Sequence, residues 1–350
     1  MRLVPLWLVV IVGVTGFGEQ SPWIAATCPP DAPFTFCTVV EGAWSTALVD
    51  RGWRRLGLMT PWSIEIRDPY TGQIAGAIAA PTPMRFVGIP VFSPDGGFLA
   101  TAVDDGSVRV WDVETGKELR LLPSHMLGGC VAFSPDGNLL AAPGPKREVV
   151  VWDVATGQKK LSLFELQPYE GSCVAGFSPD GRYLVAMAAG ISALSPPLSV
   201  VWDVATGQVV RIFPGPMVFI PDGRVLLIHY RGSGQWIALW DGPLGGKLRE
   251  SLLLWPASVM TMSVSPDGKF VAFGLGDGTV RFWEIATGQE ACKLDLRSVL
   301  GLEGETMIVQ TSFSPDGTLL ITGLWTPSTG KLQVHLWHVG ELLGAVSAGP

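Results

Sequence analysis

Charged residues are scarce in this chain, and so are the side chains that carry out most catalytic chemistry. Of 350 residues only 16% are charged and four are histidines, whereas 47% are apolar. The high apolar fraction excludes intrinsic disorder, which requires low hydrophobicity and high charge. The sequence contains neither a G-x-S-x-G elbow nor an H-E-x-x-H zinc motif. We therefore predict no catalytic residue, no metal and no cofactor.

Positive charge and cysteine are also limited. The net charge of -7 disfavours nucleic acid as a partner, because lysine and arginine must neutralise its phosphates. The five cysteines contain no C-x-x-C pair, which argues against a zinc cluster. Cys28 and Cys37 are close enough in sequence to bridge in an oxidising compartment. The alternative is that most of the cysteines are small buried hydrophobic residues.

The apolar run near the N-terminus is too short to span a membrane. It extends from Leu3 to Val14, whereas a spanning helix needs about 20 residues. Arg2 precedes the run, and Gly16 and Gly18 follow it. This pattern predicts a signal peptide over residues 1–18 and a linker over 19–33. An uncleaved anchor and a lipid-modified Cys28 are the alternatives. We expect an extracytoplasmic protein, secreted or periplasmic, whose only membrane contact is this segment.

Glycine and proline are plentiful, with 43 and 28 copies, as many short strands joined by turns require. One recurring string is Phe-Ser-Pro-Asp-Gly. Its serine, proline and glycine suit positions i, i+1 and i+3 of a type I turn. Its copies and variants recur about every 44 residues, the period of a four-stranded propeller blade. Their aspartates are Asp95, Asp136, Asp180, Asp222, Asp267 and Asp316.

A second string alternates with the first and consists of an apolar residue, Trp and Asp, usually followed by Thr-Gly. The segment before the tryptophan alternates polar and apolar residues like a half-buried strand. A seventh copy lies upstream of the other six and is degenerate, and we call it the worn copy. It has Arg67 at the tryptophan position, fifteen residues after Gly52, and the same spacing separates Gly137 from Trp152. The tryptophans of the other copies are Trp111, Trp152, Trp202, Trp240, Trp283 and Trp337.

These strings resemble the tryptophan-aspartate (WD) repeat family, in a bacterial type of repeat, over about residues 44–340. The resemblance implies an all-β fold, a seven-bladed β-propeller of four-stranded antiparallel blades, which we place at 34–348. Either residues 34–40 or 343–348 supply the last strand of blade seven. Family members often carry a Gly-His pair that bonds an aspartate, but here only His125 lies near that position. Blade stability must therefore depend more on apolar packing.

Both strings lie at one end of a blade, and the other end carries the second-third turns and the links between blades. Lengths vary there, with insertions near 191–197 and 325–330 and the longest link near 298–306. Binding residues usually lie on such loops. Arginine and aromatic residues anchor interfaces, although each can also serve ordinary packing. The candidates are Arg85, His125, Tyr169, Tyr230, Arg231, Trp236, Trp255 and Trp325.

The sequence therefore predicts a non-catalytic scaffold that binds a protein or peptide, as the resemblance to WD repeats implies. The alternative is an extracytoplasmic propeller enzyme of the hydrolase, lactonase or quinoprotein type. Such enzymes gather metal ligands or a cofactor around the central channel. The fold alone does not decide between these two functions.

Overall fold

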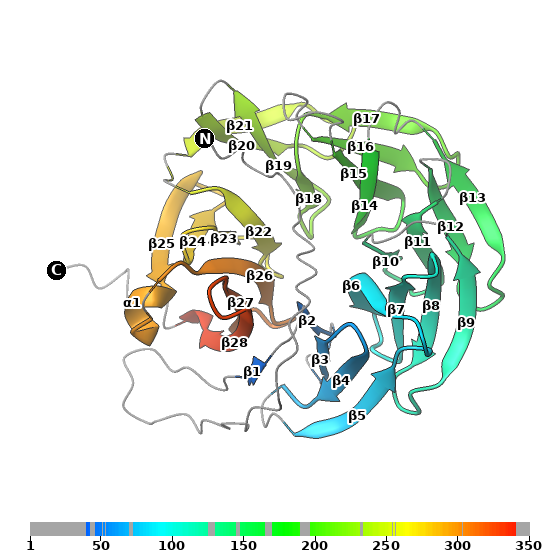
Figure 1. Cartoon of the computed structure of the whole chain (residues 1–350). Helices are drawn as coiled ribbons and strands as arrows, with labels where there is room; N and C mark the ends of the chain where they lie inside the picture. Colours follow the sequence, from blue (N-terminus) through cyan, green and yellow to red (C-terminus); the bar gives the residue numbers. More distant parts are fainter. Residues whose placement is uncertain are drawn as a thin grey trace, which may run out of the picture. The chain divides into compact units, whose positions relative to one another are not determined.

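The computed structural model describes residues 40–340 except 43–45, 51, 53, 70–72, 125–129, 145–147, 165–169, 190–196, 232–233, 254, 256 and 303. The described residues form two compact units. One comprises 61–63 and 78–253, and the other comprises 40–60, 64–77 and 255–340 (Figure 1). The predicted signal peptide and linker lie outside the described residues.

The first unit contains four sheets, in each of which the strands pair in chain order. Blade two is β6 (Phe86–Phe92), β7 (Phe98–Val103), β8 (Ser107–Asp112) and β9 (Glu118–Pro123). Blade three is β10 (Ala132–Phe133), β11 (Leu139–Pro143), β12 (Val149–Asp153) and β13 (Lys159–Leu163). Blade four is β14 (Glu170–Phe177), β15 (Tyr183–Ala189), β16 (Leu198–Asp203) and β17 (Val209–Phe213). Blade five is β18 (Met217–Phe219), β19 (Val225–Arg231), β20 (Gly234–Trp240) and β21 (Lys247–Leu253).

The second unit contains most of blade one and all of blades six and seven. Blade one is β2 (Thr46–Val49), β3 (Leu56–Met59), β4 (Ser63–Arg67) and β5 (Ile74–Ala79). Blade six is β22 (Val259–Val264), β23 (Phe270–Leu275), β24 (Thr279–Glu284) and β25 (Gln289–Asp295), followed by helix α1 (Leu296–Leu300). Blade seven combines β26 (Met307–Phe313), β27 (Leu319–Thr326) and β28 (Lys331–His338) with β1 (Val40–Gly42).

These seven sheets make a seven-bladed β-propeller of four-stranded antiparallel blades, which confirms the predicted fold class. The worn first repeat is a complete blade. Arg67 is buried where the other repeats have tryptophan, and its guanidinium lies 2.5 Å from the carboxylate of Glu65. An ion pair with a carboxylate two residues away compensates for the charge that this substitution buries.

Blade seven takes its fourth strand from the N-terminal side of the chain. β1 pairs antiparallel with β28, with Val40 opposite Val334 and Gly42 opposite Leu332. The N-terminal source is therefore correct, although the strand begins at Val40, where the predicted strand ended. Without β1, β28 would be an edge strand with a row of unpaired backbone groups. Residues 343–348 lie outside the described residues.

The Ser-Pro-Asp-Gly turns are closed networks of hydrogen bonds. In blade two, the amide of Gly96 donates to the carbonyl of Ser93 at 2.9 Å, and the Asp95 carboxylate accepts from the Ser93 hydroxyl and from the amide of Gly97. The Ser93 hydroxyl oxygen also accepts from the amide of Phe98. The carboxylate pattern recurs at Asp136, Asp180, Asp267 and Asp316. Each of these carboxylates thus hydrogen-bonds within its own turn, and the structural role of the aspartates stays a prediction.

The Trp-Asp turns also use their aspartate. The Asp153 carboxylate accepts from both the amide and the hydroxyl of Thr156, at 2.9 Å each, and the same pattern holds in blades two and four. The amide of Thr156, with the side chains of Lys160 and Thr156, lowers the pKa of Asp153 to about 2. Gly157 has a φ of 71°, a left-handed conformation that only glycine adopts without strain.

The tryptophans of the second string are core residues, and five of the six are buried. The indole N–H of Trp111 donates to Thr101 and that of Trp337 to Thr322, both at 2.8 Å. A buried indole needs such a partner. Trp325 corrects an expectation, because it lies in β27 and not in an inserted loop. The insertion lengthens the β27–β28 hairpin, which pairs its extra backbone groups out to Thr326.

Candidate functional site

Each blade has two ends with different turns. The stereotyped end carries the two string turns, whose aspartates are occupied by the backbone and by neighbouring hydroxyls. The variable end carries the second-third turns and the links between blades. The partner-binding residues were predicted to lie at the variable end. Two features stand out there, one in each unit.

In the first unit, Trp62 and Arg85 form an exposed pair beside Asp104. Trp62 lies in the turn between β3 and β4 and is 57% exposed. Arg85 lies on the link into β6, with its guanidinium carbon 5.4 Å from the centroid of the Trp62 ring. Its Nε lies 3.4 Å from a carboxylate oxygen of Asp104. The pair therefore presents an aromatic and a cationic surface to solvent, with the guanidinium oriented by a carboxylate.

The backbone beneath this pair is fixed. Two hydrogen bonds of 2.8 Å join the link to the turn, from the amide of Ala80 to the carbonyl of Trp62 and from the amide of Phe86 to that of Pro61. The amide of Arg85 also donates to the Asp104 carboxylate at 2.9 Å. Because the loops are already ordered, a partner would lose little affinity to ordering them.

Three of the other predicted residues lie in one hairpin of blade five. Tyr230 and Arg231 end β19, and Trp236 lies in β20, where it is half-buried. Trp236 pairs with His229 on one side and with Leu252 of β21 on the other. Their role in binding stays a prediction. His125 and Tyr169 lie outside the described residues.

Trp255 and Trp325, in the second unit, are both half-buried. The indole N–H of Trp255 donates to Glu290 at 2.9 Å, and its ring lies 5.1 Å from Phe273 and 6.1 Å from Trp283 between centroids. Trp325 packs against the apolar cluster of blades one and seven. Both side chains contribute packing, and their role in binding stays a prediction.

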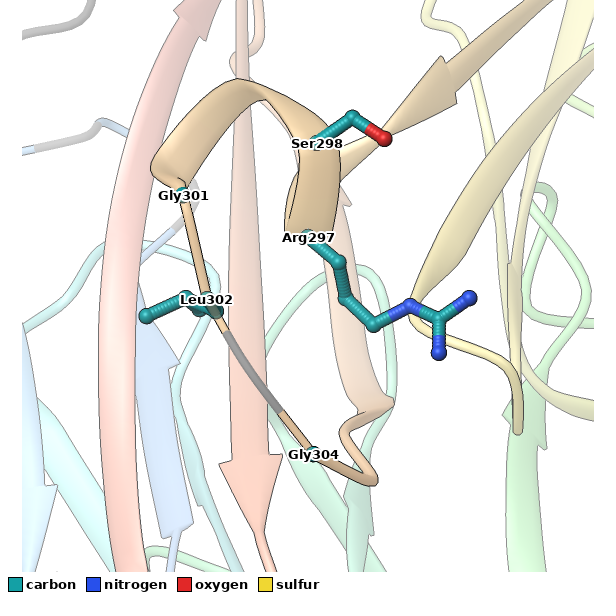
Figure 2. Close-up of a pocket in the computed structure, with 5 residues that line it drawn as sticks. All are labelled: Arg297, Ser298, Gly301, Leu302 and Gly304. Carbon is teal, nitrogen blue, oxygen red and sulfur yellow. The ribbon is translucent and has the colours of Figure 1, made fainter.

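The second feature is a pocket of about 300 Å³ on the link between β25 and β26, the region predicted to be the longest link. The carboxylate of Asp295 accepts from the amide of Ser298 at the start of α1, and Gly301 ends the helix with a φ of 62°. Figure 2 shows the Arg297 side chain extending away from Leu302. The residues that line the pocket are Arg297, Ser298, Gly301, Leu302 and Gly304.

Sequence reasoning missed Trp62 and Arg297, the most distinctive residues of these two features. Neither belongs to a repeat string. A signal did exist for Trp62, which follows Pro61 and stands five residues before Arg67, within the second-third turn of the worn blade. Arg297 lies directly before the predicted longest link. The exposure of each depends on residues distant in sequence.

Among the described residues, no three or more His, Cys, Asp and Glu side chains are grouped so that they could hold a metal ion. Burial lowers the pKa of His335 to about 3, so this imidazole is neutral at pH 7. Burial raises the pKa of the Cys292 thiol, and Cys130 is disulfide-bonded. The expected lack of a catalytic centre stays a prediction.

Membrane contact was predicted only through the N-terminal segment. No helix in the described part of the chain has the length and apolarity needed to cross a membrane.

The fold and the repeated turns define a WD-repeat β-propeller. The family model described as "WD domain, G-beta repeat" matches residues 87–112, 116–153 and 250–284. The crystal structure of the Cps50 (Swd1) β-propeller domain of Myceliophteria thermophila is similar with a TM-score of 0.66, over 86% of this chain and 100% of that chain. Its sequence identity is 14%, so this similarity shows the fold alone.

Curated relatives match shorter stretches. Eukaryotic translation initiation factor 3 subunit I of Pyricularia oryzae is 28% identical over 36% of this chain and 31% of its own length. A guanine nucleotide-binding protein subunit beta of Arabidopsis thaliana is 27% identical over 42% of this chain and 39% of its own length. The ribosome biogenesis protein ERB1 of Kluyveromyces lactis is 36% identical over 21% and 9%. The matches thus span well under half of each relative.

These relatives contradict the predicted extracytoplasmic location. By name they belong to translation initiation, ribosome biogenesis and G proteins, and protein synthesis and ribosome assembly take place inside cells. The prediction of a secreted or periplasmic protein is therefore wrong. The prediction was based on the apolar run from Leu3 to Val14. The length and hydropathy of this run describe only its composition, and composition does not determine whether a segment is exported. An apolar segment of this length is not by itself a translocation signal.

Proposed function

We propose that this chain is a non-catalytic scaffold that binds a protein or peptide through the variable ends of its blades. The observation that carries the proposal is the exposed pair of Trp62 and Arg85. Tryptophan and arginine are enriched among the residues that supply most of the binding energy at protein interfaces. Here they are stacked on a fixed backbone, and more than half of the Trp62 surface is open to solvent.

The stereotyped end supports the same assignment by contrast. Its aspartates and threonines already bond to one another and to the backbone, so they have little freedom to recognise a partner. The Trp62–Arg85 pair forms an open surface, which suits the broad contact of a protein or peptide. Interface hot spots of this kind pair an aromatic or arginine anchor with a complementary residue on the partner.

The relatives supply further support. Two of them are named as subunits of larger assemblies, and we propose an assembly role for this chain too. We also propose that its repeats are of the bacterial type, and the identical copies of Val-Trp-Asp-Val-Ala-Thr-Gly-Gln at 151–158 and 201–208 support that assignment.

The experiment compares the two ends of the blades. The partner is captured by crosslinking to the full chain in native cells, and its affinity is then measured by calorimetry. Trp62→Ala should weaken binding about 30-fold, because a hot-spot side chain contributes about 2 kcal/mol or more. Arg85→Ala should weaken it about tenfold, since the indole surface remains.

The matched controls are Lys117→Ala and Gln158→Ala at the stereotyped end, which should leave the affinity unchanged. Binding that tolerates the loss of Trp62 and Arg85 but fails in these two controls would overturn the assignment. Failure to capture any protein or peptide would overturn the scaffold proposal itself.

A further inference from the structure

Arg297 presents a guanidinium group that no described residue binds. Its Nε is buried and has no hydrogen-bond partner among the described residues. Burying an N–H of a charged group without an acceptor is unfavourable, because the group loses its bonds to water and gains nothing in return. Arginine has five N–H donors in a planar fork, so this side chain is equipped to bind an acceptor brought by another molecule.

A second buried polar atom lies beside Arg297. Thr306 is 2% exposed, and its hydroxyl also has no partner in the described part of the chain. A Cβ placed on Gly278 would lie 3.2 Å from Cγ of Arg297 and 2.5 Å from the Thr306 hydroxyl oxygen. Gly278 belongs to the turn between β23 and β24 and has a φ of 81°. The arginine stem therefore passes close to this glycine and to the buried hydroxyl.

The neighbouring carboxylates are engaged elsewhere. Asp277 accepts from the amide and the hydroxyl of Thr279, at 3.0 and 2.6 Å. Asp295 accepts from the amide of Ser298, and one of its oxygens lies 3.9 Å from Nζ of Lys293. Neither forms an ion pair with Arg297. The positive charge at this pocket is therefore not neutralised by the acidic residues described around it.

The pocket is held in shape by the short helix. Leu296 is fully buried and belongs to the apolar cluster of blades six and seven. This packing holds the backbone at the neighbouring Arg297 in place. At the other end of α1, the amide of Leu302 donates to the carbonyl of Arg297 at 3.0 Å. Arg297, the exposed Ser298 and the half-buried Leu302 all line the pocket, and Figure 2 shows the Arg297 and Leu302 side chains extending in opposite directions.

We propose that this pocket binds the carboxylate of an aspartate or glutamate in an acidic segment of a protein partner, with an adjacent apolar side chain on Leu302. This proposal rests on the scaffold function above. The guanidinium fork matches a carboxylate with two parallel hydrogen bonds, and the Ser298 hydroxyl can donate a third. A volume of about 300 Å³ suits one or two side chains. A single arginine on a chain of net charge -7 disfavours a polyanion.

The test uses two capped hexapeptides, Gly-Leu-Glu-Glu-Leu-Gly and the same sequence with glutamine at both glutamates. Each is titrated into the full-length ¹⁵N-labelled protein to about 10 mM, because one such contact gives a dissociation constant on the order of 1 mM. The Nε–Hε signal of Arg297 and the amide signals of Gly301 and Gly304 report on the pocket. The glutamate peptide should shift them in a saturable way, and the glutamine peptide should not.

Three variants assign the effect. Arg297→Gln should weaken glutamate-peptide binding by about tenfold to a hundredfold, the range for a charge-assisted hydrogen bond. Arg297→Lys, which keeps the charge without the fork, should fall between this variant and the wild type. Arg182→Gln removes an exposed arginine from the stereotyped end and should bind like the wild type. An unchanged amide spectrum outside the pocket verifies that each variant is folded.

Several results would overturn the proposal. They are equal binding of the glutamine peptide, full binding by Arg297→Gln, no shift of the pocket signals at 10 mM peptide, or equally tight binding of free succinate, which would indicate a small-anion site. The scaffold proposal is judged separately by the capture experiment. A partner retained by wild type and Arg297→Gln alike would refute only the pocket, whereas failure to capture any partner would refute the scaffold.

Discussion

Two arginine–tryptophan pairs in this protein share a geometry and differ in exposure. Arg85 lies over Trp62 at 5.4 Å, and Arg281 lies over Trp255 at 5.7 Å. Each arginine also pairs with a carboxylate, at 3.4 Å for Arg85 and 2.8 Å for Arg281. The Arg85 side chain is 49% exposed and that of Arg281 only 14%. The same combination of side chains thus stands open in one unit and is packed in the other.

The packed pair, Arg281 and Trp255, belongs to a larger group of side chains. The Trp255 indole donates to Glu290, which also binds Arg281, and its ring contacts Phe273 and the repeat tryptophan of blade six. The loops around Trp62 are joined by backbone hydrogen bonds, from the amide of Ala80 to the carbonyl of Trp62 and from the amide of Phe86 to that of Pro61. Of the two tryptophans, Trp255 on a link thus packs in an aromatic cluster, whereas Trp62 in a second-third turn is 57% exposed.

The largest expected effect is on stability. Trp255→Ala should cost about 2–4 kcal/mol, because it removes a half-buried ring from an aromatic cluster and leaves Glu290 without one donor. Trp62→Ala should change stability by less than about 0.5 kcal/mol, as exposed substitutions usually do. Urea midpoints at a common m-value measure both variants. Equal losses would remove the distinction between the two pairs.

Substitution of the two arginines should also cost more stability in the packed pair than in the exposed pair, but by a smaller amount than for the tryptophans. Arg281→Met should cost about 1–2 kcal/mol, because a mostly buried guanidinium leaves its carboxylate partner without a counterion. Arg85→Met should cost less than about 0.5 kcal/mol, since exposed ion pairs contribute little. The same urea titrations apply. A larger cost for Arg85 would mean that the Asp104 contact holds the link, and the exposed pair would then be structural.

Low pH should reduce the stability of the protein through the aspartates of the stereotyped turns, and the exposed Trp62 should not contribute to this loss. The hydrogen bond from Ser314 holds the pKa of Asp316 below its usual range, and that of Asp153 is about 2. A depressed pKa in the folded state stabilises the protein above about pH 4, and this contribution is lost as the pH falls toward 2. Asp153→Asn should make the stability profile shallower between pH 4 and pH 2. Trp62→Ala should retain the wild-type slope.

The smallest effect concerns reactivity and leaves stability unchanged. Hydroxyl-radical footprinting with mass spectrometry should oxidise Trp62 faster than Trp255, because 57% of the Trp62 surface is open to solvent while Trp255 is half-buried. Trp202, which is fully buried, is the slow reference within the same protein. Addition of a bound partner should slow Trp62 alone. Oxidation of Trp255 at the rate of Trp62 would contradict the packed assignment.

The fold could be predicted from the sequence because its specifications are local. Ser93, Asp95 and Gly96 form their turn with atoms at most five residues away, and so do Asp153 and Thr156. Each repeat therefore encodes its own hairpins, and the period counts the blades. Even the worn copy keeps its sheet, because Arg67 is neutralised by a residue only two positions away.

The site could be predicted only in part, because exposure is decided by distant contacts. Arg85 was recognised on a link, but its partner Trp62 precedes it by two strands, β4 and β5. Trp255 has the same residue type and position as an interface anchor, and only its contacts with β23, β24 and β25 show that it is packed. Trp325 was predicted to lie in a loop. The extra residues between the two recurring strings of blade seven could form either a loop or a longer hairpin, and the sequence did not distinguish the two.

The pairing of β1 with β28 sets an order of events during synthesis. Val40 leaves the ribosome before its partner Val334, which follows about 300 residues later. At about 5–20 residues per second, the early strand waits about 15 to 60 s for the hairpin that it completes. Throughout that interval it offers unpaired backbone groups to any extended segment nearby. Newly made chains should therefore depend on chaperone protection of their first strand until the last hairpin emerges.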